Sequence, residues 1–273
     1  MTHMHVAGSI HADAVSAAPN WLVKPTDANV LVDGLWSGTV ARADDGAIRI
    51  GGLTVQEIVE QVGTPAYVID EVDFRGRALT WRQAFEGWKV YYASKSFLCG
   101  TVARWIDDAG LNLDVASMGE LTVALRAGFD PARIGLHGNN KSDALLRLAL
   151  TRGVGRIVVD SPDEISRLER LTAELGVTAS VQIRVTTGVE AHTHEYIATA
   201  HEDQKFGFSL AGGAAAEAVR RVLRAPGLRL VGLHSHIGSQ IFEVDAFELS
   251  AHRVIGLLAE LHKEHGSDAM ASV

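Results

Sequence analysis

Lys95 is the residue whose type and surroundings point most directly to chemistry. It stands in the stretch Val-Tyr-Tyr-Ala-Ser-Lys95-Ser-Phe, an apolar run that predicts a strand. Alternation along that strand places Lys95 on the face of Ala93 and Tyr91, and the small alanine leaves room beside it. In most proteins a strand-end lysine reaches solvent. A lysine that points inward and is partly desolvated instead becomes a nucleophilic amine suited to Schiff-base chemistry, and both interpretations stay open here.

A second group of residues lies in Gly-Leu-His234-Ser-His236-Ile-Gly238-Ser239-Gln240. The turn at Gly238 and Ser239 offers backbone amides and a hydroxyl, which suit a phosphate group. The imidazole of His236 comes just before that turn and could lie flat against an aromatic ligand. His234 and His236 also have the spacing of a metal-binding pair, but the next residues supply no third ligand. The alternative without a functional role is a strand that ends in two histidines and a turn.

Carboxylates and further histidines complete the candidate residues. Asp114 follows an apolar strand segment, and an inward carboxylate there needs a partner. Glu120 stands three residues after Ser117, so the two form a capping box at a helix start. The histidines of residues 192–195 and 201–203 match no standard zinc pattern. We interpret that region as a polar loop over the site rather than a metal site.

Alternating strands and helices must position these residues. Ser117 and Ser161 each begin a capping pattern, and the second has proline at the first helical position. Gly128 is expected to close the helix that begins after Ser117. The last helix is expected to run from about Ala246 to His265. The predicted strands are Ala66–Ile69, Val90–Phe97, Leu111–Ser117, Arg133–Asn139, Arg156–Asp160, Ser180–Val185 and Leu228–Ile237.

This alternation indicates an α/β fold with a parallel sheet covered by helices. An open doubly wound sheet should carry nearly continuous apolar strands. The strands here instead place polar residues on one face near their C-terminal ends, where a (β/α)8 barrel keeps its active site. The sequence therefore predicts an incomplete (β/α)8 TIM-type barrel with about six strands from Val90 onward. The polar pairs are Asn112 with Asp114, His137 with Asn139, Gln182 with Arg184, and His234 with His236.

The N-terminal part of the chain has a different pattern. Residues 1–34 carry no clear period and are expected to form a flexible lead-in. Within residues 35–64, the stretches Ser37–Arg42 and Ala47–Ile50 flank Asp-Asp-Gly, which predicts a β-hairpin. Residues 65–273 make up the partial barrel.

Composition limits the class of protein. The 273 residues carry 25 basic and 33 acidic side chains, a net charge of −8, which argues against nucleic acid as the main partner. No apolar run is long enough to span a bilayer, and the first thirty residues contain no signal-peptide core. The single cysteine, Cys99, cannot form an internal disulfide. These features predict a soluble cytoplasmic protein.

Taken together, the motifs resemble those of the pyridoxal-phosphate decarboxylases of the alanine-racemase fold. Tyr-Ala-Ser-Lys95 is similar to their cofactor-lysine motif. The segments Leu-Asp114-Val-Ala-Ser-Met-Gly-Glu120-Leu, His137-Gly-Asn-Asn-Lys141 and Lys205-Phe-Gly207 follow in the family's order, and residues 234–240 come after them. Within this family, residues 188–207 most resemble the diaminopimelate decarboxylases of actinobacterial type. The resemblance runs from about residue 35 to the end.

The resemblance implies pyridoxal 5′-phosphate as cofactor, an amino-acid substrate and no metal. Lys95 would bind the cofactor covalently, and His236 would stack on its pyridine ring; these are the expected catalytic residues. Gly238 and Ser239 would bind the phosphate group. Asp114 and Glu120 would belong to the polar network around cofactor and lysine, and Arg184 would lie near the ring hydroxyl.

The implied activity is decarboxylation of meso-2,6-diaminopimelate to L-lysine by a homodimer. The alternatives are another decarboxylase or a racemase of the same fold, a non-catalytic cofactor-binding protein, and a fragment that folds only with a partner. Family members continue into a glycine-rich phosphate loop, a glutamate at the pyridine nitrogen and a β-domain to which residues 35–64 would contribute. We therefore expect this chain to be a truncated copy or fragment that is poorly active alone.

Overall fold

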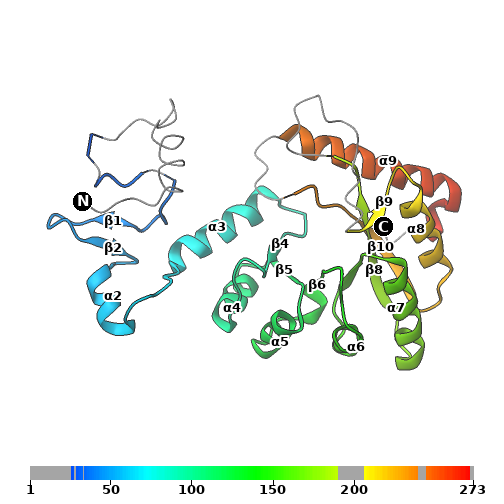
Figure 1. The fold of residues 1–273 in the computed structure, drawn as a ribbon, viewed down its shortest axis with the longest axis horizontal. Coiled ribbons are helices and arrows are strands. Elements are labelled where there is room, and N and C mark those ends of the chain that lie inside the picture. The colour runs from blue at the N-terminus through cyan, green and yellow to red at the C-terminus, as the bar shows by residue number, and fades with distance from the viewer. Residues whose placement is uncertain (1–25, 28, 33, 190–205, 239–243, 271–273) are drawn as a thin grey trace, which may run out of the picture. The chain divides into compact units, whose positions relative to one another are not determined.

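The computed structural model describes residues 26–27, 29–32, 34–189, 206–238 and 244–270 (Figure 1). The chain divides into two compact units, Met1–Phe74 and Arg75–Val273. Of the expected lead-in, only residues 26–27, 29–32 and 34 are described. No helix among the described residues is long and apolar enough to cross a membrane.

The first unit contains a small antiparallel sheet. Strands β1 (Ala41–Arg42), β2 (Ile48–Ile50) and β3 (Leu53–Thr54) pair in that order, and helix α2 (Val55–Val62) follows directly. Gly46, at φ 84°, provides the left-handed conformation that the turn between β1 and β2 needs. The β-hairpin predicted around this turn is confirmed.

The strand predicted at Ala66–Ile69 is wrong. These residues take no regular structure, and no described strand pairs with them. An apolar run becomes a strand only where a neighbouring ladder satisfies its backbone groups. The segment instead leads to helix α3 (Glu71–Ala84). Just before α3, the Asp70 carboxylate accepts hydrogen bonds from the hydroxyls of Ser37 (2.7 Å) and Thr39.

The second unit is built on a curved parallel sheet, and this confirms the predicted α/β barrel-type fold. The six principal strands pair in the order β10-β8-β7-β6-β5-β4, and a short strand, β9, pairs with β8. Among the described residues β4 and β10 remain at opposite edges, so the barrel is not closed. The strands are β4 (Tyr91–Ala93), β5 (Asn112–Val115), β6 (Ile134–Leu136), β7 (Arg156–Val159), β8 (Ala179–Thr186), β9 (Phe208–Ser209) and β10 (Leu228–His234).

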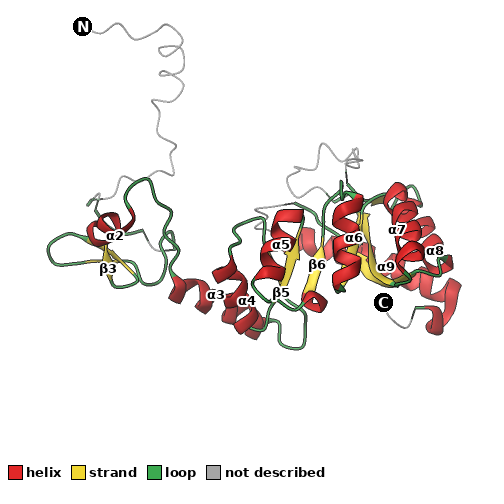
Figure 2. Ribbon diagram, turned by 90° about the horizontal axis from the view of Figure 1, so that it is seen from below, coloured by secondary structure: helices red, strands yellow, loops and turns green. Residues whose placement is uncertain are grey.

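Helices connect successive strands and follow one another around the outside of the sheet (Figures 1 and 2). The Ser117 hydroxyl accepts the Glu120 N–H at 3.2 Å, and Ser161 caps its helix through Glu164 in the same way, as the sequence predicts. The last helix is continuous only to Gly266, whose φ of 79° and ψ of 166° break it close to the expected end. The helices are α4 (Gly100–Asp108), α5 (Met118–Arg126), α6 (Asp143–Arg152), α7 (Pro162–Leu175), α8 (Ala214–Arg224) and α9 (Val244–Ala269), with a 3-10 turn at Pro131–Arg133.

Strand β8 shows how the sheet separates its two faces. Ala179, Val181, Ile183 and Val185 are buried, whereas the residues between them are partly exposed. The buried set packs beneath the helices, because successive strand side chains point to opposite faces. The other face, with Gln182, Arg184 and Thr186, is the inner side of the curved sheet. Strand β5 alternates in the same way, with Leu113 and Val115 buried.

A wholly buried ion pair lies where β6, β7 and α7 meet. The Lys141 ammonium is 2.7 Å from the Glu164 carboxylate, and neither side chain is exposed to solvent. Lys141 also donates to the carbonyl oxygens of Gly138 and Val158, both at 2.6 Å, so all three of its donors are used. Burial lowers the pKa of Lys141 and raises that of Glu164, but each charge opposes the shift of the other. The pair therefore fixes the loop after β6 against the end of β7.

Replacing Lys141 with methionine tests this pair. The K141M variant leaves the Glu164 carboxylate buried without a counter-charge, so we expect the free energy of unfolding to fall by about 3–5 kcal/mol. The double variant K141M/E164Q removes both charges and should recover part of that loss. Urea denaturation followed by circular dichroism measures both effects.

The ion pair between Arg147 and Glu174 is the matched control, because it joins α6 to α7 at 2.6 Å but is 45% and 43% exposed. The R147M variant should change the free energy of unfolding by less than about 1 kcal/mol. Equal losses in K141M and R147M would contradict the role given to the buried pair.

Candidate active site

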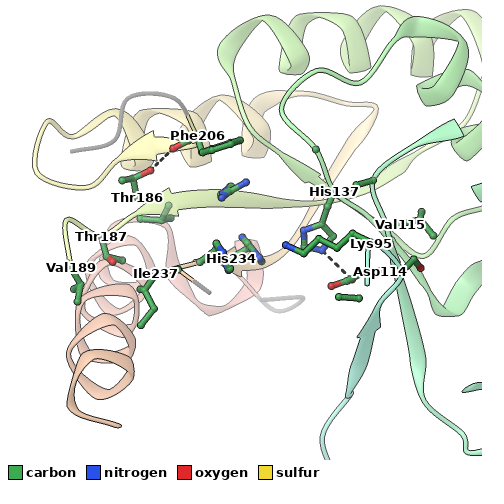
Figure 3. A pocket seen from close by; sticks show the side chains of 18 of the residues that line it. Lys95, Asp114, Val115, His137, Thr186, Thr187, Val189, Phe206, His234 and Ile237 are labelled. Atoms are coloured by element: carbon green, nitrogen blue, oxygen red, sulfur yellow. Dashed lines mark hydrogen bonds and ion pairs between the residues drawn. The ribbon is translucent and has the colours of Figure 1, made fainter. Parts of the chain in front are cut away.

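A cavity of about 880 Å³ opens at the C-terminal ends of the parallel strands (Figure 3). This is the end of a barrel at which active sites are found. Each contributing strand brings a polar side chain to the cavity from its last residues or from the loop that follows. These side chains are Lys95 after β4, Asp114 from β5, His137 after β6, Arg184 from β8, and His234 and His236 at and after β10.

Lys95 reaches the cavity from a turn rather than from a strand. The strand predicted to run to Phe97 ends at Ala93, whose carbonyl accepts the Ser96 N–H at 3.1 Å. The Ser94 N–H donates to the Asp114 carbonyl at 3.0 Å, which ties this turn to β5. The Lys95 side chain is exposed, extends into the cavity toward the histidines (Figure 3), and forms no hydrogen bond or ion pair with a described residue.

Asp114, His137 and His234 line the cavity and are connected by two successive contacts. The Asp114 carboxylate lies 3.1 Å from His137 Nε2, and the His137 ring meets the edge of the His234 ring at 5.0 Å between centroids. The Nδ1 atom of His234 is buried without a hydrogen-bond partner among the described residues. Burial lowers the pKa of His234 to about 3, and the nearby His137 and Arg184 lower it further. His234 is therefore neutral at physiological pH.

A β-bulge in β10 determines which way His234 points. Leu230 pairs with Val181, but Gly232 pairs with Gln182, so one extra residue is inserted at Val231. Without that insertion, alternation from Leu230 would turn His234 toward the helices. With it, His234 lies opposite Arg184 on the inner face. The bulge is the local reason that the end of β10 presents histidine to the cavity.

Arg184 is held from two sides. Its Nη1 donates to the Asp160 carboxylate at 3.3 Å, and the centre of its guanidinium lies 4.6 Å from the centroid of the Phe206 ring. The second carboxylate oxygen of Asp160 accepts the Gly207 N–H at 3.1 Å. The cation is therefore in contact with both a buried carboxylate and an aromatic face.

The structure brings most of the expected site residues together. Lys95, Asp114, Arg184, His236 and Gly238 all line the cavity. His236 is exposed, and its pKa is lowered first by burial of the ring and then by the charges of Arg184 and Lys95.

Glu120 does not line the cavity. One of its carboxylate oxygens accepts the Ala116 N–H at 2.6 Å, so it fixes the backbone between β5 and α5. Ser239, Gln240 and the histidine-rich residues 190–205 lie outside the described residues. The described part of the chain contains no group of three or more histidine, cysteine or acidic side chains placed to hold a metal.

Three cavity residues had no expected role. His137 and His234 were placed on the inner face by their alternation with Asn139 and His236, and that was the available signal. Phe206 stands in the Lys-Phe-Gly motif, but nothing local indicates that its ring covers Arg184. The contact between Phe206 and Arg184 joins residues that are far apart in the sequence, and only the assembled sheet brings them together.

Replacing His234 with glutamine tests its buried, neutral state. Because folding lowers the pKa of His234 from 6.5 to about 3, the unfolded chain binds more protons between these values. The contribution of His234 to the free energy of unfolding is therefore complete above about pH 6.5 and falls as the pH drops, by at most about 1.4 kcal/mol per pH unit. H234Q should lose less stability than the unaltered protein between pH 7 and pH 5.

Urea denaturation at several pH values measures this difference. His252 is a matched control because its side chain is 75% exposed, and H252Q should keep the pH dependence of the unaltered protein. Identical pH dependence in H234Q and H252Q would show that His234 is not the buried titrating group.

Comparison with known proteins agrees with this arrangement. Residues 71–271 match the family described as "pyridoxal-dependent decarboxylase, pyridoxal binding domain". A diaminopimelate decarboxylase of Mycobacterium leprae is 52% identical over 99% of this chain and 58% of its own length. One from Mycobacterium bovis is 54% identical over 89% of this chain and 55% of its own length. The chain thus spans somewhat more than half the length of these relatives.

Solved structures show the same fold. The diaminopimelate decarboxylase of M. jannaschii, in complex with L-lysine, superposes with a TM-score of 0.77 at 30% identity, over 84% of this chain and 54% of that one. The Helicobacter pylori enzyme, also complexed with L-lysine, gives a TM-score of 0.68 at 29% identity, over 76% of this chain and 52% of that one. With its cavity at the strand ends and a family match over residues 71–271, this chain belongs to the pyridoxal-dependent decarboxylase family through its pyridoxal-binding domain.

Proposed function

We propose that the cavity binds pyridoxal 5′-phosphate and that Lys95 is the residue that attaches it covalently. The observation that carries the proposal is the Lys95 amine, which extends into a largely apolar cavity and has no hydrogen-bond or ion-pair partner among the described residues. The cavity volume of about 880 Å³ lies within the range of small-molecule sites. Two buried polar atoms nearby, Ser94 Oγ and His234 Nδ1, also lack partners among the described residues. The residues present therefore fit a polar aromatic cofactor.

The remaining residues of the cavity take roles that suit their positions. We propose that His236 lies against the cofactor ring and that Gly238 and Ser239 bind its phosphate group. The Arg184 guanidinium, oriented by Asp160 and Phe206, is placed to donate to a ring oxygen. We propose that Asp114, with His137 as its partner at 3.1 Å, belongs to the polar network around the cofactor and Lys95.

Glu120 is proposed to act indirectly on the same network. Its bond to the Ala116 N–H holds the end of β5 in place, and Asp114 lies two residues before Ala116. Glu120 thereby supports the position of the Asp114 carboxylate without facing the cavity.

The reaction that we propose is decarboxylation of meso-2,6-diaminopimelate to L-lysine. Its support is the naming of relatives more than 50% identical to this chain and the L-lysine bound in two related structures. When bound, the cofactor supplies the electron sink that carboxyl loss from an amino acid requires. The Lys95 amine would hold the cofactor, and its Nζ atom would be placed to move a proton at the substrate. We further propose that the whole protein is a cytoplasmic homodimer.

Substitution of Lys95 tests the cofactor site. The purified chain mixed with pyridoxal 5′-phosphate should develop a near-visible absorbance band, because covalent attachment changes the conjugated system of the cofactor. Borohydride should then fix the cofactor onto the peptide that contains Lys95, as detected by mass spectrometry. K95A should give neither the band nor the labelled peptide.

Lys89 provides the control, because it is exposed, precedes β4 and does not line the cavity. K89A should keep both signals. A band of equal strength in K95A, or labelling of Lys89 in place of Lys95, would overturn the assignment.

The substrate proposal has its own test. Because a substrate amine displaces Lys95, an added amino acid should alter the Lys95-dependent band. We expect meso-2,6-diaminopimelate to do so at lower concentration than L-ornithine, and a spectroscopic titration measures both. A preference for L-ornithine would point to a different decarboxylase of the same fold.

A further inference from the structure

Asp160 is a buried carboxylate that faces away from solvent at the end of β7. Its side chain is only 5% exposed, and it does not line the cavity. Both oxygens are used: Oδ1 accepts from Arg184 at 3.3 Å, and Oδ2 accepts the Gly207 N–H at 3.1 Å. One carboxylate thus joins two parts of the chain that lie more than twenty residues apart.

We infer that Asp160 is the positioning residue of the cavity: it holds the Arg184 guanidinium in place and fixes the backbone at Gly207. Phe206, which covers Arg184, directly precedes Gly207. Fixing Gly207 therefore also helps to place the Phe206 ring against the guanidinium. Arg184 is held by one carboxylate in two ways, directly through its own bond and indirectly through Phe206.

The backbone near Gly207 admits little variation. Gly207 has a φ of 73°, and a Cβ atom there would lie 2.7 Å from the Arg184 carbonyl oxygen. The chain therefore passes in contact with β8 at this point, and only glycine fits. The Thr186 hydroxyl donates to the Phe206 carbonyl, which adds a second link between this segment and β8.

Asp160 is itself held firmly from the outside of the sheet. Its N–H donates to the Glu164 carboxylate at 3.3 Å, and Glu164 is paired with the buried Lys141. Lys141 also binds the carbonyl of Val158, two residues before Asp160. The buried ion pair and the cavity cation are therefore linked through a single residue at the end of β7.

A neighbouring positive charge explains why a carboxylate beside Arg184 matters. Lys95 lines the same cavity as Arg184. Without Asp160, the guanidinium would lose its counter-charge and the bond that fixes Gly207 beside Phe206. It would then be free to turn away from the cavity.

Two substitutions of Asp160 separate its two bonds. In D160N the amide oxygen still accepts the Gly207 N–H, but the amide NH₂ faces Arg184, which has donors only and cannot accept a hydrogen bond. In D160A both bonds are lost. Asp163 is the matched control, because it lies in the same strand–helix junction, is 78% exposed and pairs with Arg167 at 2.9 Å.

Hydrogen exchange by nuclear magnetic resonance, on the chain without added cofactor, decides the inference. We expect exchange at the Arg184 side chain to accelerate about tenfold or more in both variants, and exchange at the Gly207 amide to accelerate only in D160A. D163N should match the unaltered protein at both sites. Unchanged Arg184 exchange in D160N and D160A, both shown to be folded by circular dichroism, would overturn the inference.

A titration with pyridoxal 5′-phosphate tests whether Asp160 also affects the affinity of the cavity for the cofactor. This part of the inference rests on the proposed function. The dissociation constant should rise about tenfold in D160N and D160A and stay unchanged in D163N. If the unaltered chain fails to bind the cofactor while the exchange pattern holds, the proposed function fails and the role of Asp160 stands. If the unaltered chain binds and D160A binds equally well, Asp160 does not position Arg184 for the cofactor.

Discussion

The strict alternation of side chains along parallel strands is the constraint on which this structure depends. In β5 and β8 every second residue is apolar and buried beneath the helices, so the residues between them must face the inner side of the sheet. The sheet is parallel, and the strand ends therefore meet at one edge. The polar residues that stand at or just after those ends are thereby collected into one cavity.

The fold could be predicted from the sequence because this alternation is local. Helix starts at Ser117 and Ser161 also depend on residues three positions apart, and both were correct. The strand predicted at Ala66–Ile69 failed because an apolar run does not reveal whether a pairing strand exists. Lys95 was placed correctly for an incomplete reason, since the strand ends at Ala93 and a turn delivers the lysine.

Parts of the site were hidden from sequence reasoning for physical reasons. The sequence pattern placed His234 on the inner face, but nothing in the apolar run before it signals the inserted residue at Val231 that turns it there. Asp160 ends an apolar strand, but its two partners come from residues 184 and 207, which only the assembled sheet brings near. Glu120 was expected in the polar network and also in a capping box with Ser117. Ser117 does cap the Glu120 N–H, but the Glu120 carboxylate accepts the Ala116 N–H in place of the Ser117 N–H.

The buried pair of Lys141 and Glu164 has an evolutionary consequence. Since neither side chain touches solvent, the loss of one charge leaves the other buried without its counter-charge, which is unfavourable. Substitution at one position is tolerated only when the other changes with it, so the two sites should covary across descendants of this sequence. Residue 160 should also covary with these two positions, because Glu164 accepts a hydrogen bond from its backbone N–H. A divergent copy that has neutralised both positions would retain the barrel but would no longer hold the backbone of residues 158–160 in this way.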